Sequence, residues 1–229
     1  ILFPSPKLMP NSSLAHYLNL AVQEFGLDKS RHLMDEDGIN FPALFDDLVK
    51  AEQSGTPYAL LGASFSFVHV IDEMERTGKT VVLPPGSRIL DTGGFKGQSR
   101  ELKPDAFYDK LEATFGVPRN RCINMYGMTE LSSQFYDDGN AICPSVKSGP
   151  NWLRSRVINP ITGQNMPDGE MGILAHTDLA HFNICTTVLT EDTGIVVDNG
   201  FQLIGRASGI EAQGCSIAVD EFLKASSRN

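Results

Sequence analysis

The sequence predicts an α/β fold: a mostly parallel sheet with packed helices, followed by a β-rich portion and a short C-terminal helix. Two observations predict this fold. Over the first two thirds of the chain, segments with helical hydrophobic spacing alternate with short apolar runs, as in strand–helix–strand units. After Gly149-Pro150, the pattern changes to β-branched runs separated by turn pairs. We therefore expect an α/β subdomain over residues 1–150 and a β-rich subdomain over residues 151–229.

Four helices are predicted in the first part, each with a recognisable start or end. The first begins after the candidate N-caps at 11–13 and ends at Gly26. The others cover residues 42–53, residues 65–76 with Gly78 as the end, and a segment from Pro104 to Gly116. Short apolar runs predict strands at residues 58–61, 81–83, 88–90 and 121–125.

In the second part, Asn199-Gly200 lies between two apolar runs, at 195–197 and 201–204, and predicts a β-hairpin. Turn pairs at 162–163 and 168–169 separate the runs before it. A last helix is predicted over residues 217–225.

Composition excludes several classes of protein. The net charge of −9 argues against a surface for duplex DNA or another nucleic acid. Hydrophobic residues make up 41% of the chain, enough for an ordinary core. Because no unbroken apolar run reaches the roughly 18 residues of a membrane span, we expect none. Four cysteines without a Cys-x-x-Cys pair argue against structural zinc and favour a reducing cytoplasm.

Three familiar site patterns fail or stay open. The segment Thr77–Thr80 ends like a phosphate-binding P-loop, but Glu73 stands where its first glycine belongs. His176 and His181 are five residues apart, which favours strand or loop histidines over two metal ligands on one helix face. The chain has no Gly-x-Ser-x-Gly elbow, although residue counts alone leave a hydrolase triad open.

Three clusters remain that could carry chemistry. Residues 91–97 place three glycines after a strand, where the backbone can approach a flat or anionic ligand; the alternative is a plain turn. Residues 124–130 place Tyr126, Thr129 and Glu130 after another strand, where they could stack on a base, meet a phosphate and hold Mg²⁺. The alternative there is a helix start with Thr as its N-cap.

The third cluster combines residues 190–194 with Gly205-Arg206. A carboxylate near a strand end can accept both hydroxyls of a ribose. Arg206 follows Asp192 by 14 residues, on the far strand of the predicted hairpin, so both could reach one ligand. The alternative is a surface acid and a surface base.

In this order, the motifs Asn-x-Tyr-Gly-x-Thr-Glu, Thr-x-Asp-x-Gly and Gly-Arg resemble the adenylate-forming superfamily of acyl-CoA synthetases, luciferases and peptide-synthetase adenylation domains. A Gly-Glu-x-Gly segment at 169–172 adds to the likeness. Within it, the chain looks closest to LuxE-type acyl-protein synthetases, the fatty-acid-activating subunits of bacterial bioluminescence reductases. The closer likeness rests on residues 91–101, 126–136 and 205–216 and runs from about residue 11 to the end. It implies part of an adenylate-forming fold.

The resemblance implies a set of nucleotide-binding residues, namely Gly93, Gly94, Asn124, Tyr126, Gly127, Thr129, Asp192 and Arg206. In this family the two glycines line the nucleotide and acyl pocket, and the Tyr packs on adenine with a glycine beside it. Asp192 would bind the ribose hydroxyls, and Arg206 would approach ribose or phosphate.

The resemblance also implies the catalytic residues Thr129, Glu130 and Cys215. Thr129 would contact the α-phosphate, Glu130 would bind Mg²⁺, and Cys215 would take up the acyl group as a thioester. A helix start after Cys215 would favour its thiolate, while the alternative is a small buried hydrophobic residue. The implied substrates are ATP and a fatty acid, and an acyl-transferring reductase subunit is the implied partner.

Two family features are missing from the sequence: a Ser/Thr/Gly/Lys-rich phosphate loop before the tyrosine motif, and a mobile C-terminal domain with a lysine. The first absence, and a start at Ile-Leu-Phe-Pro without a leader, lead us to expect that an N-terminal half belongs to the protein. Two alternatives stay open. One is an acid–CoA or acid–amine ligase. The other is a non-catalytic nucleotide-binding module.

Overall fold

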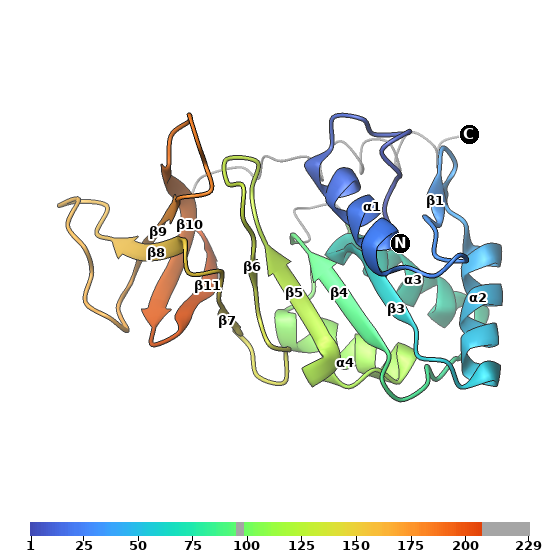
Figure 1. Cartoon of the computed structure of the whole chain (residues 1–229). Coiled ribbons are helices and arrows are strands. Elements are labelled where there is room, and N and C mark those ends of the chain that lie inside the picture. The colour runs from blue at the N-terminus through green and yellow to red at the C-terminus, as the bar shows by residue number, and fades with distance from the viewer. Residues whose placement is uncertain (95–98, 208–229) are drawn as a thin grey trace. The chain divides into compact units, whose positions relative to one another are not determined.

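The structure, a computed structural model, describes residues 1–94 and 99–207 in two compact units, Ile1–Cys122 and Ile123 onward (Figure 1). The helices of the first unit are α1 (Ser13–Phe25), α2 (Phe41–Ser54), α3 (Ser64–Thr77), α4 (Pro104–Phe115) and the 3₁₀ helix η1 (Arg119–Arg121). Its strands are β1 (Met34–Asp35), β2 (Gly38–Ile39), β3 (Ala59–Ala63) and β4 (Arg88–Thr92), and β5 (Cys122–Tyr126) begins at its last residue.

All four helices predicted in the first part are confirmed. The Ser12 side chain caps α1 by accepting a hydrogen bond from the Ala15 backbone N–H at 3.2 Å. Helices α3 and α4 end where the sequence predicts, at Gly78 and Gly116, whose φ angles of 65° and 67° lie in the left-handed region.

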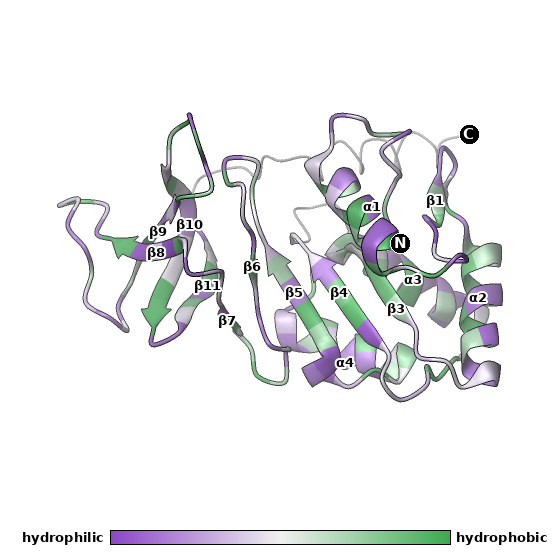
Figure 2. Cartoon of the chain, viewed as in Figure 1, coloured by the Kyte–Doolittle hydropathy of each residue, from purple (hydrophilic) through white to green (hydrophobic). Residues whose placement is uncertain are grey.

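The strands β3 and β4 pair in parallel, from Ala59 opposite Arg88 to Ala63 opposite Thr92. Strand β3 is rich in hydrophobic residues, β4 has them in its middle between hydrophilic ends, and α2 alternates hydrophobic and hydrophilic ones (Figure 2). Leu18 of α1 belongs to a core cluster against which Leu61 of β3 and Leu90 of β4 pack. Helix α3 contacts β3, β4 and α4. Strands with packed helices are therefore confirmed in this unit.

The strand predicted at residues 81–83 is wrong. Val81 and Leu83 are buried, so the apolar pattern is real, but the segment has no strand partner. Its backbone donors go elsewhere, because Val82 N–H donates to Glu52 Oε1 at 2.8 Å and Leu83 N–H to Phe115 O at 2.8 Å. Periodicity over three residues cannot separate a buried strand from a buried connection.

The second unit is dominated by an antiparallel sheet in the order β7-β11-β10-β9-β8. Its strands are β7 (Val146–Lys147), β8 (Leu153–Ile158), β9 (Met171–Asp178), β10 (Thr187–Val197) and β11 (Gly200–Arg206). The predicted hairpin is confirmed as β10–β11, with Val197 opposite Gly200. A short strand, β6 (Phe135–Tyr136), pairs antiparallel with β5, whereas β3 and β4 pair in parallel as predicted.

The β-rich character of the second part is confirmed by this sheet, whose core includes Leu153, Leu174 and Phe201. The subdomain division after residue 150 stays a prediction, and the helix predicted at 217–225 lies outside the described residues. Across residues 1–94 and 99–207, no helix has both the length and the apolar character needed to cross a membrane.

Candidate functional site

The structure brings Tyr126, Asp192 and Arg206 together in the second unit. Tyr126, the last residue of β5, donates a hydrogen bond from Oη to Asp192 Oδ2 at 2.7 Å. Arg206 Nε lies 3.4 Å from the other oxygen, Asp192 Oδ1. Two of the three clusters predicted from the sequence therefore meet at one carboxylate.

The hairpin explains how Asp192 and Arg206 meet. They lie directly opposite each other in the β10–β11 register. Thr190 holds the backbone of this segment, because its Oγ1 accepts from Asp192 N–H at 3.0 Å and donates to Leu174 O on β9 at 2.8 Å. The threonine of the Thr-x-Asp-x-Gly motif thus fixes where its aspartate stands.

An aromatic cluster surrounds the half-buried Tyr126 ring. Ring centroids of Phe135, His176 and Phe201 lie 6.0, 5.6 and 5.6 Å from that of Tyr126. Edge and tilted contacts of this kind hold a ring in place. The phenol is therefore positioned by packing as well as by its hydrogen bond.

Burial shifts two acid–base groups of this cluster. Desolvation, followed by the neighbouring Asp192 carboxylate, raises the pKa of Tyr126 above its usual range, so this phenol stays a donor. Burial lowers the pKa of His176 to about 4. The His176 ring stays neutral near pH 7, with Nδ1 2.9 Å from Ser155 Oγ.

Thr129 and Glu130 stand exposed on the loop that follows β5. Thr129 Oγ1 donates to Glu130 Oε2 at 3.2 Å. Hydroxyl and carboxylate oxygens are suitable ligands for a phosphate and for Mg²⁺ respectively, so the donor set fits both groups. Gly127 is exposed beside Tyr126.

Asn124, on β5, is held through its backbone. Asn124 N–H donates to Asp137 Oδ1 at 2.9 Å, and Asn124 O accepts from Lys147 Nζ at 3.1 Å. Asp137 and Lys147 form a buried ion pair of 2.5 Å. The sequence reasoning missed both residues.

Asp178 is a third residue that the sequence reasoning missed. It is fully buried at the end of β9. Its carboxylate accepts from the backbone N–H groups of Ser132 and Ser133 at 2.9 and 2.7 Å. An aspartate that follows an apolar run looks in the sequence like an ordinary strand end, so no signal marked it.

Gly93 and Gly94 directly follow β4 in the first unit. Gly93 has a φ of 79° and its carbonyl oxygen lies 3.1 Å from Ser64 Oγ. Ser64 Oγ also donates to the buried Asp91 at 2.7 Å, so the start of this cluster is held by α3. Residues 95–98 and Cys215 lie outside the described residues, and the roles predicted for Gly93, Gly94 and Cys215 stay predictions.

The patterns rejected from the sequence have structural explanations. Gly78 is the C-cap of α3, and Lys79 Nζ lies 3.9 Å from the centroid of the Phe45 ring. His176 lies on β9 and His181 in the turn after it. In the part of the chain that the structure describes, no group of three or more His, Cys, Asp or Glu side chains could hold a metal ion.

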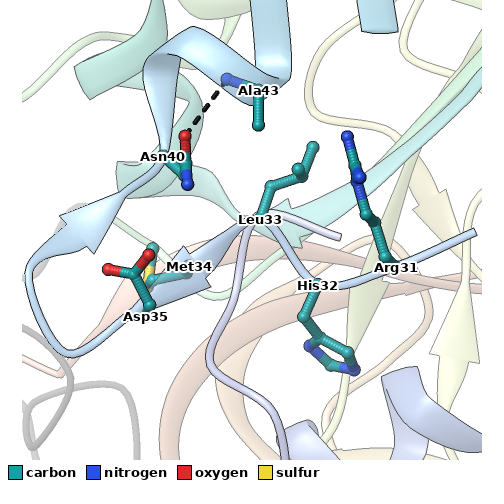
Figure 3. A pocket seen from close by; sticks show the side chains of 7 residues that line it. All are labelled: Arg31, His32, Leu33, Met34, Asp35, Asn40 and Ala43. Carbon is teal, nitrogen blue, oxygen red and sulfur yellow. Dashed lines mark hydrogen bonds between the residues drawn. The ribbon is translucent and has the colours of Figure 1, made fainter.

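A hollow in the first unit is lined by Arg31, His32, Leu33, Met34, Asp35, Asn40 and Ala43 (Figure 3). Its polar groups serve the fold. Asn40 Oδ1 caps α2 by accepting from Ala43 N–H at 3.1 Å, and Arg31 pairs with Asp47 at 2.9 Å. Burial lowers the pKa of His32, whose Nδ1 lies 2.9 Å from Phe3 O. None of the predicted site residues lines this hollow.

The fold of the chain is similar to that of adenylate-forming proteins. A structure of McyG A-PCP complexed with phenylalanyl-adenylate matches 73% of this chain and 29% of its own, with a TM-score of 0.51 and 14% sequence identity. This likeness defines the class of fold: part of an adenylate-forming domain.

The family match is more specific than the similarity in fold. Residues 13–224 match the family described as "Acyl-protein synthetase, LuxE", and the chain belongs to this family. It is 24% identical over 200 residues to the long-chain-fatty-acid–luciferin-component ligase of Vibrio harveyi, covering 83% of this chain and 52% of that protein. The ligase of the same name from Aliivibrio fischeri is 27% identical over 167 residues, covering 71% and 43%. The chain spans about half the length of these curated relatives.

Proposed function

We propose that this chain contributes the nucleotide-binding loops of an ATP-dependent acyl-protein synthetase, which activates a fatty or other carboxylic acid as an acyl adenylate and passes the acyl group to a protein thiol. Family membership and the names of the two relatives support the substrate class. The single observation that carries the proposal is the cluster of Tyr126, Asp192 and Arg206 at one carboxylate.

The reaction has two steps. A carboxylate oxygen attacks the α-phosphorus of ATP, the bond to the bridging oxygen breaks, and pyrophosphate leaves. The resulting mixed anhydride has AMP as a good leaving group, so a thiolate can displace it and form a thioester. Alignment and charge neutralisation then account for most of the catalysis.

Each residue of the site has a role in this proposal. Tyr126 packs on adenine, Asp192 accepts the ribose hydroxyls, and Arg206 adds positive charge beside ribose or phosphate. The hydroxyl of Thr129 donates to the α-phosphate. Mg²⁺ on Glu130 would neutralise charge that develops on the phosphates.

Several roles rest on the family likeness alone. Gly93 and Gly94 are proposed to line the nucleotide and acyl pocket, with Asn124 and Gly127 completing the set around Tyr126. Cys215 is proposed as the thiol, and an acyl-transferring reductase subunit as the partner. We also propose a reducing cytoplasm as the location, in keeping with the low cysteine count and the lack of a Cys-x-x-Cys pair in the sequence.

Calorimetry with AMP tests the ribose assignment. We expect Asp192→Asn to weaken AMP binding about tenfold, because an amide cannot accept hydrogen bonds from two hydroxyls with both of its polar atoms. Glu191→Gln is the matched control, since Glu191 is the exposed neighbour and its carboxylate lies 3.5 Å from Arg206 Nη1. AMP affinity that is equal in Asp192→Asn and wild type would contradict the assignment.

A further inference from the structure

The loop that carries Thr129 and Glu130 is short, and the core holds it on both sides. Leu131 N–H donates to Met128 O at 3.2 Å and closes a turn with the two polar residues between them. Leu131 is buried in the core of the second unit, and the partly buried Met128 packs against that core. Thr129 and Glu130 are therefore exposed on a turn whose two flanking residues are fixed.

The backbone directly after this turn is held by Asp178. Asp178 Oδ2 accepts from Ser132 N–H at 2.9 Å and from Ser133 N–H at 2.7 Å. Asp178 Oδ1 accepts from Ser133 Oγ at 3.2 Å and from Ala180 N–H at 2.9 Å. Three of the four donors belong to residues that begin two positions after Glu130.

Burying a carboxylate to satisfy these donors is energetically unfavourable. The donors that the structure gives Asp178 are neutral, and Asp178 is fully buried. Burying a charge is energetically unfavourable, and apolar packing often stabilises a fold as well. One carboxylate oxygen accepts from the two consecutive N–H groups, and the other accepts from Ser133 Oγ and Ala180 N–H. An amide has a single acceptor oxygen, so it cannot satisfy all four donors, and hydrogen bonds to a charged acceptor are also stronger.

Asp178 is itself held by the sheet. It lies on β9 opposite Leu153 of β8, and its N–H donates to Thr186 O at 2.8 Å. Strand β9 pairs with both β8 and β10, so its end is held by neighbouring strands on both sides. The Asp178 carboxylate therefore ties the loop to a fixed position relative to the sheet.

We infer that Asp178 is a positioning residue: by holding Ser132 and Ser133 it sets where Thr129 and Glu130 stand for the phosphates and Mg²⁺ of ATP. The inference rests on the proposed function, because the roles of Thr129 and Glu130 do. It goes beyond that function in naming the residue that orders them.

Two ligands separate the loop from the rest of the site. Adenosine carries only the base and ribose, which are assigned to Tyr126 and Asp192, whereas Mg-ATP also needs Thr129 and Glu130. We expect Asp178→Asn to weaken Mg-ATP binding about tenfold, the value of one charge-assisted hydrogen bond, while adenosine affinity stays within about twofold. Asp168→Asn, in an exposed turn, is the matched control for losing one carboxylate.

Amide hydrogen exchange provides a readout that needs no ligand. In Asp178→Asn, the amide protons of Ser132 and Ser133 should exchange at least about tenfold faster than in wild type, with β9 protection unchanged. Equal protection in the two proteins would overturn the inference.

The binding outcomes distinguish the two proposals. Mg-ATP affinity that is unchanged in Asp178→Asn, or equal losses for adenosine and Mg-ATP, would overturn the positioning role and leave the nucleotide site intact. Wild-type protein that binds neither ligand would refute the proposed function, and the positioning role with it.

Ser133→Ala decides the question if Asp178→Asn does not fold. This variant removes one donor to Asp178 and the acceptor of Trp152 Nε1–H, now 3.0 Å from Ser133 Oγ, but keeps the carboxylate and both backbone donors. We expect about threefold weaker Mg-ATP binding and unchanged adenosine binding. Unchanged Mg-ATP affinity in Ser133→Ala would then overturn the inference.

Discussion

His176 is a fully buried imidazole among aromatic rings, with its ring centroid 4.9 Å from that of Phe135 and 5.2 Å from that of Phe201. Burial disfavours its charged form and lowers its pKa to about 4, from an ordinary value of 6.5. Unfolding exposes the ring and restores the ordinary pKa. The unfolded chain therefore binds more protons than the folded one between pH 6.5 and about 4.

This difference predicts acid destabilisation with a defined sign. The contribution of His176 to the free energy of unfolding is complete above pH 6.5, is lost as the pH falls, and reaches a loss of about 3 kcal/mol near pH 4. Urea unfolding at pH 7 and pH 4.5 should show a smaller decrease for His176→Phe than for wild type. Equal decreases would contradict the assigned cause.

The site residues that could be predicted from the sequence are those that lie in recognisable motifs. Each of Tyr126, Asp192 and Arg206 stands in a motif, Tyr126 and Arg206 at the ends of β5 and β11 and Asp192 within β10. The hairpin spacing predicted that Asp192 and Arg206 lie on facing strands. No such motif surrounds Asp178 or the pair of Asp137 and Lys147. Their roles come from burial and from contacts distant in sequence, Ser133 to Asp178 for example, which no local pattern encodes.

At the scale of elements, the β10–β11 hairpin aligns the site, and Gly194 permits its close packing. The register shifts between Thr193 and Gly194. A Cβ at Gly194 would lie 2.8 Å from Gln202 O and 2.9 Å from Leu174 Cδ1. The glycine of the Thr-x-Asp-x-Gly motif is therefore needed because β11 and a core leucine on β9 come too close to leave room for a side chain.

Gly194→Ala should lower the free energy of unfolding by about 2 kcal/mol, because the added methyl overpacks this contact. Gly205→Ala is the matched control on the facing strand, since a methyl group there would meet no atom within 4 Å, and it should change stability by less than about 0.5 kcal/mol. Urea unfolding of the two variants checks the difference. If the two variants were equally stable, β11 and Leu174 would accommodate the added methyl group without loss of stability, and the prediction would be wrong.

Elements were predictable where local signals agreed with packing. Ser12, Gly78 and Gly116 mark helix ends by side-chain capping or by backbone conformation, both of which are local properties. Strand pairing is not local, so the segment at 81–83, apolar but bonded to Phe115 and Glu52, could not be separated from the true strand at β4.

At the scale of the whole molecule, the class of fold follows from the order of elements: an α/β unit, then an antiparallel sheet. The comparisons narrow this class to a family of acyl-protein synthetases. This chain spans about half the length of its curated relatives. A test of the thioester step should therefore not depend on the first half-reaction.

A labelled fatty acyl adenylate, supplied ready-made, meets that need. We expect label to become attached to wild-type protein as a thioester, released by neutral hydroxylamine, and to be absent from Cys215→Ser. Cys185→Ser is the matched control, because Cys185 is an exposed thiol of the β9–β10 connection and should not be the acceptor. Label that persists in Cys215→Ser would exclude that thiol. Label that appears only on added coenzyme A would favour an acid–CoA ligase, because the acyl group would then pass to coenzyme A without forming a thioester on the protein.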